Sequence, residues 1–196
     1  MGEKQVFQPL TREEKITVVL YRVGIALSTI IISLLTYLLA TASPYASSLS
    51  DILAYGLYVS IGMSVFFIHL YVGRFKTFLK NLYFISLACF VALLYIGKGS
   101  LSSALVQQPY NFLLLLPLSG CLGFVTAKEA FCFKLIEGYL LAVIMPLYLL
   151  LVSSNILSGR SASNGLVLIA VLLVIFTLRK AFMPIAYDIG DKSAYQ

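Results

Sequence analysis

The stretch that decides the class of this protein runs from Thr126 to Val152 and reads TAKEAFCFKLIEGYLLAVIMPLYLLLV. It is an apolar run with charges near its beginning and with Glu137 well inside it. Thr126 and Glu129 have the spacing of a capping box, in which each side chain accepts a hydrogen bond from the other residue's backbone N–H at a helix N-terminus. We therefore expect a helix over residues 127–152, which is long enough to cross a membrane.

On that helix Glu137 lies about 15 Å from Ala127 at the usual rise per residue. A charge at the centre of a membrane-spanning helix costs on the order of 2.5–3.5 kcal/mol. We therefore predict that Glu137 is protonated, is paired, or points into a helical bundle. The candidate partners are Lys134, Arg22 and His69, in that order, because Lys134 is carried by the same helix.

The composition of the whole chain indicates an all-α, polytopic membrane protein. The 196 residues are 60% hydrophobic and only 11% charged, whereas about 25% of residues are charged in soluble domains. The net charge of +6 is scattered between apolar blocks, and it does not form the single basic patch of a nucleic-acid-binding protein. We expect one integral membrane domain over residues 1–196, with the lipid bilayer as its main partner and no nucleic acid.

Hydropathy predicts a bundle of six transmembrane helices. The expected spans are residues 16–40, 51–72, 79–96, 111–124, 127–152 and 165–182. A second capping box, from Thr11 to Glu14, precedes the first span. The fourth span is short and contains Pro117, and a proline removes a helical hydrogen bond and clashes with the preceding turn. We expect a kink or a break there.

The distribution of basic residues predicts the orientation. Lysine and arginine concentrate in short cytoplasmic loops. If the N-terminus is cytoplasmic, all of the 14 basic residues except Lys98 and Arg160 fall on the cytoplasmic side of the six spans. We therefore expect both termini to be cytoplasmic, or stromal if the membrane is a thylakoid.

Four intramembrane residues form the candidate polar cluster. Arg22, His69 and Glu137 are expected at a similar depth, with Lys134 beside them, so that they could converge and relieve one another's desolvation. In the alternative interpretation Arg22 extends to lipid headgroups, His69 lies at the membrane interface, and Glu137 pairs with Lys134 along its own helix.

Lys128 and Glu129 allow two interpretations as well. They could line a charged entrance to a cavity between the helices. They could also mark only the beginning of a helix at the level of the cytoplasmic headgroups, and this second interpretation is the one we favour.

Small residues recur at every fourth position in two of the expected spans. Gly56, Ser60 and Ser64 form one stripe, and Gly138 and Ala142 form a shorter one. Such stripes allow helices to approach closely. We expect them to pack inside the bundle and not between copies of the chain.

No motif in the sequence indicates a catalytic or a metal site. The three cysteines lack the spacing of zinc ligands, and there is a single histidine. The sequence contains no Gly-x-Ser-x-Gly elbow, His-Glu-x-x-His helix or P-loop. We therefore expect no enzyme, no catalytic residue and no metal ion, while a cofactor is left open.

The block Ala127–Tyr139, AKEAFCFKLIEGY, together with the length and the hydropathy, resembles a family of uncharacterised integral membrane proteins with six spans in cyanobacteria and plant plastids. The likeness is clearest from Gly120 to Pro146. The resemblance implies a photosynthetic lineage and a multi-pass protein of the thylakoid or plasma membrane. It carries over no catalytic residue.

Three functions fit these observations. The first is an accessory or assembly factor that associates with a larger photosynthetic or respiratory membrane complex. The second is a small carrier or channel that uses Glu137 as its coupling group and the span around Pro117 as a discontinuous helix. The third is an intramembrane enzyme or a membrane protein that binds a pigment, a quinone or a lipid, with His69 and Glu137 as the possible ligands.

Overall fold

The computed structural model describes residues 10–41, 46–70 and 72–189. Its helical segments are, in chain order, α1 (Arg12–Ala40), α2 (Ala46–Phe67), α3 (Gly73–Ile96), α4 (Leu101–Gln107), the 3-10 helix η1 (Pro109–Leu115), α5 (Leu116–Phe133), α6 (Ile136–Ser153), α7 (Gly159–Ala181) and the 3-10 helix η2 (Ile185–Asp188). Six helical segments are long and apolar enough to cross a membrane when η1 and α5 are counted as one. The predicted all-α polytopic bundle is therefore confirmed.

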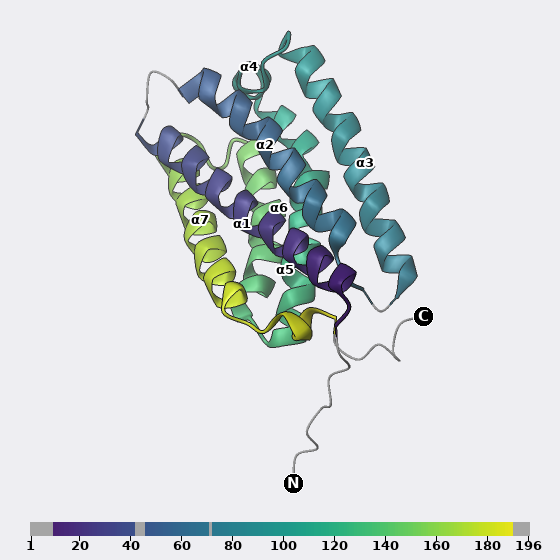
Figure 1. Ribbon diagram of the computed structural model, residues 1–196. Helices are drawn as coiled ribbons and strands as arrows, with labels where there is room; N and C mark the ends of the chain where they lie inside the picture. The colour runs from purple at the N-terminus through teal and green to yellow at the C-terminus, as the bar shows by residue number, and fades with distance from the viewer. Residues whose placement is uncertain (1–9, 42–45, 71, 190–196) are drawn as a thin grey trace.

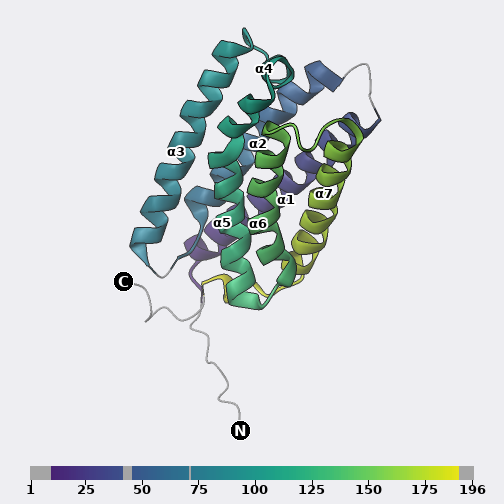
Figure 2. The same cartoon turned by 180° about the vertical axis from the view of Figure 1, so that it is seen from behind.

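The long helices form two layers with a helix at each edge (Figure 1). The helices α1 and α2 pack against each other in one layer, and α5 and α6 form the layer behind them, which faces the viewer in Figure 2. One edge is closed by α3, which contacts α2 and α5, and the other by α7, which contacts α1 and α6. The short helix α4 lies across one end of the bundle, against α2 and α3.

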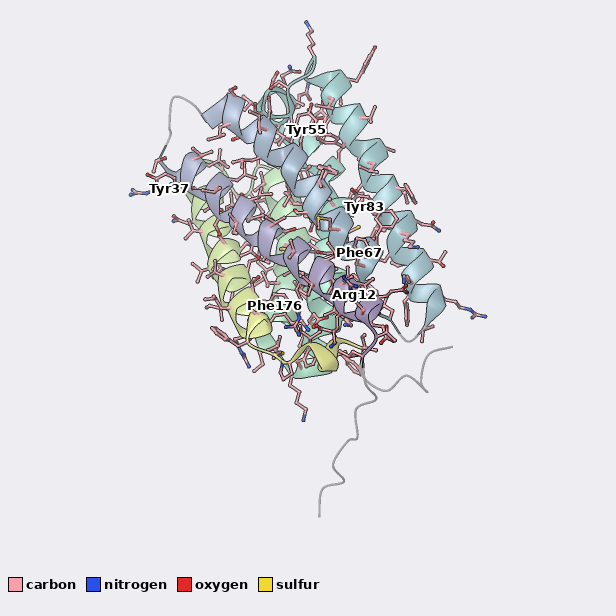
Figure 3. The ribbon with its side chains drawn as sticks, in the orientation of Figure 1. Arg12, Tyr37, Tyr55, Phe67, Tyr83 and Phe176 are labelled. Atoms are coloured by element: carbon pink, nitrogen blue, oxygen red, sulfur yellow. The ribbon has the colours of Figure 1, made fainter. Side chains whose placement is uncertain are left out.

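The two ends of the bundle differ in charge. At one end α1, α3 and α6 begin and α2, α5 and α7 end, and η2 packs there against α1; we call it the charged end. Among the residues that the structure describes, the exposed cations of this end are Arg12, Lys15, Arg74, Lys134 and Arg179. Lys98 and Arg160 lie at the opposite end, where α3 ends and α7 begins. In Figure 3 the label of Arg12 lies toward the charged end and those of Tyr37 and Tyr55 toward the other.

Small residues set the closest helix contact. A Cβ atom placed on Gly24 of α1 would lie 2.5 Å from Ser64 Oγ and 2.7 Å from the carbonyl oxygen of Ser60, both on α2. Close approach also lets the hydroxyls of Ser28 and Ser60 hydrogen-bond at 2.8 Å, a contact that satisfies polar groups without water. On α6, a Cβ on Gly138 would lie 2.6 Å from the carbonyl oxygen of Thr126 on α5. Both predicted stripes therefore pack inside the bundle.

The beginning of the fifth span is the main correction to the sequence analysis. Thr126 lies in the interior of α5, and its hydroxyl donates to the carbonyl oxygen of Gly123 at 3.0 Å instead of capping a helix. The chain turns at Lys134, which has left-handed backbone angles (φ 55°, ψ 44°), and α6 begins at Ile136. The capping-box pattern fails because the backbone N–H groups near Thr126 already bond within a helix that continues from Leu116.

The other boundaries also move. The fourth span is not short: η1 and α5 together cover Pro109–Phe133. The second span ends at Phe67 instead of residue 72, the third begins at Gly73 instead of residue 79, and the sixth begins at Gly159 instead of residue 165. The polar residues at the beginnings of α3 and α7 are helical because a helix extends beyond the hydrocarbon into the headgroup region.

Two local predictions hold, the capped beginning of the first span and an irregularity at Pro117. Thr11 caps α1, with Glu14 N–H donating to its hydroxyl at 3.2 Å and Thr11 N–H donating to the Glu14 carboxylate at 2.8 Å. The fourth span changes from a 3-10 helix to an α-helix between Leu115 and Leu116, and Pro117 occupies the first turn of α5, so the expected kink or break takes the form of a change of helix type. A proline is tolerated in a first turn, where its missing N–H has no helical partner to lose.

Candidate functional site

A cluster of charged side chains is buried inside the charged end. It joins α1, α5, α7 and η2, and it consists of Tyr21, Arg22, Lys128, Glu129, Lys180 and Asp188. We call it the ionic cluster. Tyr21 and Arg22 come from α1, Lys128 and Glu129 from α5, Lys180 from the end of α7, and Asp188 from η2.

Glu129 is the centre of the cluster and is completely buried, with 0% of its surface exposed. Its Oε1 accepts a hydrogen bond from the Tyr21 hydroxyl at 2.7 Å and another from Lys128 Nζ at 2.7 Å. Its Oε2 forms an ion pair with Lys180. Two hydrogen-bond donors and one further cation, from three helices, thus converge on one carboxylate, which is how a buried charge is retained in a medium of low dielectric constant.

Lys180 links the two acidic residues of the cluster. Its ammonium group pairs with Glu129 and with Asp188 Oδ1, and it lies 4.1 Å from the centre of the Phe133 ring. The side chain is only 2% exposed. An aromatic face attracts a cation most strongly when the cation is removed from water, so Phe133 adds a third stabilising contact to the two ion pairs.

Arg22 attaches the segment after α7 to α1. Its Nε donates to Asp188 Oδ2 at 2.6 Å, and its terminal nitrogens donate to the carbonyl oxygens of Met183 and Pro184 at 2.6 and 3.1 Å. These carbonyls follow the end of α7, where backbone acceptors have no helical partner. The guanidinium group of Arg22 therefore satisfies backbone carbonyl groups that follow α7, and it holds η2 against α1.

A family model described as "Uncharacterized integral membrane protein (DUF2301)" matches residues 63–196, which is more than half of the chain. The chain belongs to the DUF2301 family. Comparison with curated proteins and with solved structures finds no match. The expected resemblance to a family of uncharacterised integral membrane proteins is thus confirmed, and the chain is a multi-pass integral membrane protein.

The DUF2301 match covers most of the ionic cluster. Lys128, Glu129, Lys180 and Asp188 lie inside the matched residues, while α1, which supplies Tyr21 and Arg22, precedes them. The favoured interpretation of Lys128 and Glu129 as a helix beginning at the headgroup level is wrong. They lie near the end of a helix, and Glu129 is in the protein interior.

Glu137 is buried, as predicted, but neither its depth nor its partner is the expected one. It is the second residue of α6 and therefore lies at the end of a span. Both of its carboxylate oxygens accept from Arg179 Nη1 of α7 at 2.8 Å. Glu137 is 7% exposed, whereas the Arg179 side chain is 51% exposed. The aromatic ring of Phe176, labelled in Figure 3, packs one turn earlier on α7 against the backbone of Gly138.

The expected candidate partners of Glu137 lie elsewhere. Lys134 ends α5 in the turn before α6 and is exposed, and Arg22 belongs to the ionic cluster. The physical reason is the turn at Lys134. Because the chain forms two helices here instead of one, the Glu137 side chain points toward α7 and Lys134 stays exposed.

His69 contacts Thr17 and not an acidic residue. Thr17 donates its single hydroxyl hydrogen to the carbonyl oxygen of Glu14 at 2.9 Å, which leaves the hydroxyl oxygen to accept from His69 Nε2 at 3.0 Å. Burial, with the nearby charges of Lys128 and Lys76, lowers the pKa of His69 below its usual 6.5. The ring is therefore neutral at pH 7 and links α1 to the end of α2.

The residues that sequence reasoning missed are Tyr21, Lys180, Asp188 and Arg179. The sequence marks Arg179 and Lys180 only as two of the basic residues that predict the orientation, and Asp188 lies in the polar tail. Their spacing gave no signal, because the pairs join residues as far apart as Arg22 and Asp188. Among the residues that the structure describes, no group of three histidine, cysteine, aspartate or glutamate side chains could hold a metal ion.

Proposed function

We propose that this protein acts by association, as an accessory or assembly factor of a larger complex in a photosynthetic or respiratory membrane, and not as an enzyme. One observation carries the proposal. All four carboxylate oxygens of Glu129 and Asp188 are engaged by Tyr21, Arg22, Lys128 or Lys180. A general acid or base must instead reach the proton of a substrate. The charges of the cluster join α1, α5, α7 and η2 into one body.

The charged end supplies the surface for such association. Its exposed cations, among them Lys134 in the turn between α5 and α6, favour contact with acidic loops of a partner. We place this end on the cytoplasmic or stromal side, because basic residues are retained there. A thylakoid or plasma membrane of a photosynthetic organism is the location that the sequence resemblance favours.

Co-purification tests the association. After solubilisation in mild detergent, the tagged protein should migrate with a larger complex on a native gel, and mass spectrometry of crosslinked peptides should place the contacts at the charged end. Reversing the charge of Lys134 (Lys134→Glu) should weaken co-purification. The matched control is Arg160→Glu, which reverses an exposed cation at the opposite end, and it should have no effect.

A mass equal to that of the isolated protein or its homo-oligomer in every fraction would contradict the association. Equal behaviour of Lys134→Glu and Arg160→Glu would contradict the assignment of the charged end as its surface.

A small carrier or channel is the second candidate. The observation that favours it is the pairing of buried Glu137 with Arg179, whose half-exposed side chain connects the pair to water. Ionisable residues within membrane proteins often mark ion pathways. Replacing Glu137 with glutamine removes the charge and keeps the shape. If Glu137 couples transport, the Glu137→Gln variant should fold and localise but lose transport. If Glu137 is structural, the variant should keep its function.

A further inference from the structure

A groove opens on the bundle between α1 and α7 at the charged end, where these helices lie side by side (Figures 1 and 2). Its volume is about 250 Å³. Apolar side chains of both helices and of η2 form the walls, among them Val23, Ala26 and Ile185. Two cations of the ionic cluster, Arg22 and Lys180, also line it. The groove therefore combines an apolar channel with a positive charge at the end of a membrane span.

The size of the groove limits what it can hold. Sites for whole cofactors or drug-sized ligands enclose about 300–1,000 Å³, so this groove accommodates only part of a larger molecule. Val23 and Ile185 are partly exposed on its rim, and in a bilayer that rim faces lipid. An acyl chain matches this shape, because one part of it fills the groove while the remainder stays among the surrounding lipids.

The net charge of the ionic cluster indicates that an anion binds there. Among the residues that the structure describes, the cluster contains three cations, Arg22, Lys128 and Lys180, but only two carboxylates, Glu129 and Asp188, so its formal charge is +1. An unbalanced charge in a medium of low dielectric constant is costly. One negative group would balance it.

Arg22 is the cation best placed to bind that group. Its guanidinium carries five N–H donors, and three of them bond to atoms of the described chain. Its side chain is 14% exposed and lines the groove. Arginine binds phosphate oxygens well because its planar fork offers several donors in a fixed geometry.

We propose that the groove between α1 and α7 binds one anionic phospholipid, with an acyl chain along the apolar walls and the phosphate at Arg22. Basic pockets between membrane helices on the cytoplasmic side bind anionic lipid headgroups in this way. The binding goes beyond the association function and does not require it, since the site is complete within one chain.

Competition between two lipids for the unmodified chain tests whether the site prefers an anionic lipid. The full-length protein is purified in detergent, mixed with equal amounts of phosphatidylglycerol and phosphatidylcholine, and examined by native mass spectrometry. We expect one retained phosphatidylglycerol per chain and a preference of about fivefold over the zwitterionic phosphatidylcholine, because the attraction between one cation and an anionic lipid is about 1 kcal/mol. Equal retention of the two lipids, or retention of neither, would overturn the proposal. So would displacement of the lipid by excess inorganic phosphate, which would assign the site to a free anion.

A second arm tests the groove itself. Ala26→Phe fills the channel, while the control Ala88→Phe adds the same ring at an exposed position of α3, away from the groove. We expect Ala26→Phe to reduce the bound phosphatidylglycerol about fourfold for each methylene group that the ring displaces from the groove, because burying one methylene group is worth about 0.8 kcal/mol, and we expect Ala88→Phe to leave it unchanged. Equal retention by the two variants would show that the lipid binds elsewhere. Because the lipid competition uses the unmodified chain, it tests the preference for an anionic lipid even if Ala26→Phe does not fold.

Discussion

Replacing Glu129 with glutamine should destabilise the bundle more than any other loss of one acidic side chain. The substitution keeps the shape and still lets the Tyr21 hydroxyl donate to the side-chain oxygen, which it now meets at 2.7 Å. It removes the negative charge that Lys128 and Lys180 share. Removing one partner of a buried ion pair costs about 3–5 kcal/mol, because the other charge stays buried.

The structure places the effect at the low end of that range. Lys180 keeps Asp188 as a partner, and the Lys128 side chain is 10% exposed and can extend toward water. We therefore expect a loss of about 3 kcal/mol. For a chain of this size, 1 kcal/mol corresponds to about 2–4 °C in Tm, so the expected decrease is about 6–12 °C.

Thermal unfolding in detergent measures this decrease. Cys121 is completely buried, so a thiol-reactive fluorescent dye reports unfolding through Cys121 once Cys89 and Cys132 are replaced by serine. The matched control is Glu13→Gln, which removes an exposed carboxylate in the first turn of α1. Surface substitutions of this kind change stability by less than about 0.5 kcal/mol.

A double substitution separates charge from packing. If Glu129 acts through its ion pair with Lys180, the loss from Glu129→Gln together with Lys180→Met should be smaller than the sum of the two single losses, by roughly 0.5–3 kcal/mol. Additive losses, or a shift for Glu129→Gln no larger than that for Glu13→Gln, would refute the reasoning.

Three further predictions concern packing, pH and orientation. Gly24→Ala should destabilise by about 1–3 kcal/mol, since its Cβ would meet the α2 backbone at 2.7 Å, whereas Gly56→Ala, which meets only a flexible side chain at 3.2 Å, should cost less in the same dye assay. Because the folded-state pKa of His69 lies below its usual 6.5, the unfolded chain binds more protons, so stability should fall as pH decreases below about 6.5, and His69→Gln should flatten this dependence. Cysteine placed at Arg160 should be labelled from the side opposite to Cys132, and labelling of both from one side would contradict the topology.

The turn after α5 shows where sequence reasoning stopped. Thr126 and Glu129 satisfy a capping-box pattern, but the pattern describes only four residues and cannot reveal that the helix already began at Leu116. The real break, at Lys134, carries neither glycine nor proline, and the residue after it, Leu135, is buried. A turn made of residues typical of a helix gives little local signal. The sequence therefore predicts too early a beginning for the fifth span, and it places Glu137 too deep in that span.

The sequence by itself determined the class of the protein, because a bilayer requires long apolar helices whose backbone hydrogen bonds are made internally. It also determined the capped beginning of α1 at Thr11 and the change of helix type beside Pro117, since both depend on neighbouring residues. Only the tertiary structure decided which charges meet. Tyr21 and Glu129 are 108 residues apart, and Arg22 and Asp188 are 166 apart. Their pairing depends on how α1, α5, α7 and η2 pack at one end of the bundle, and no local pattern encodes that packing.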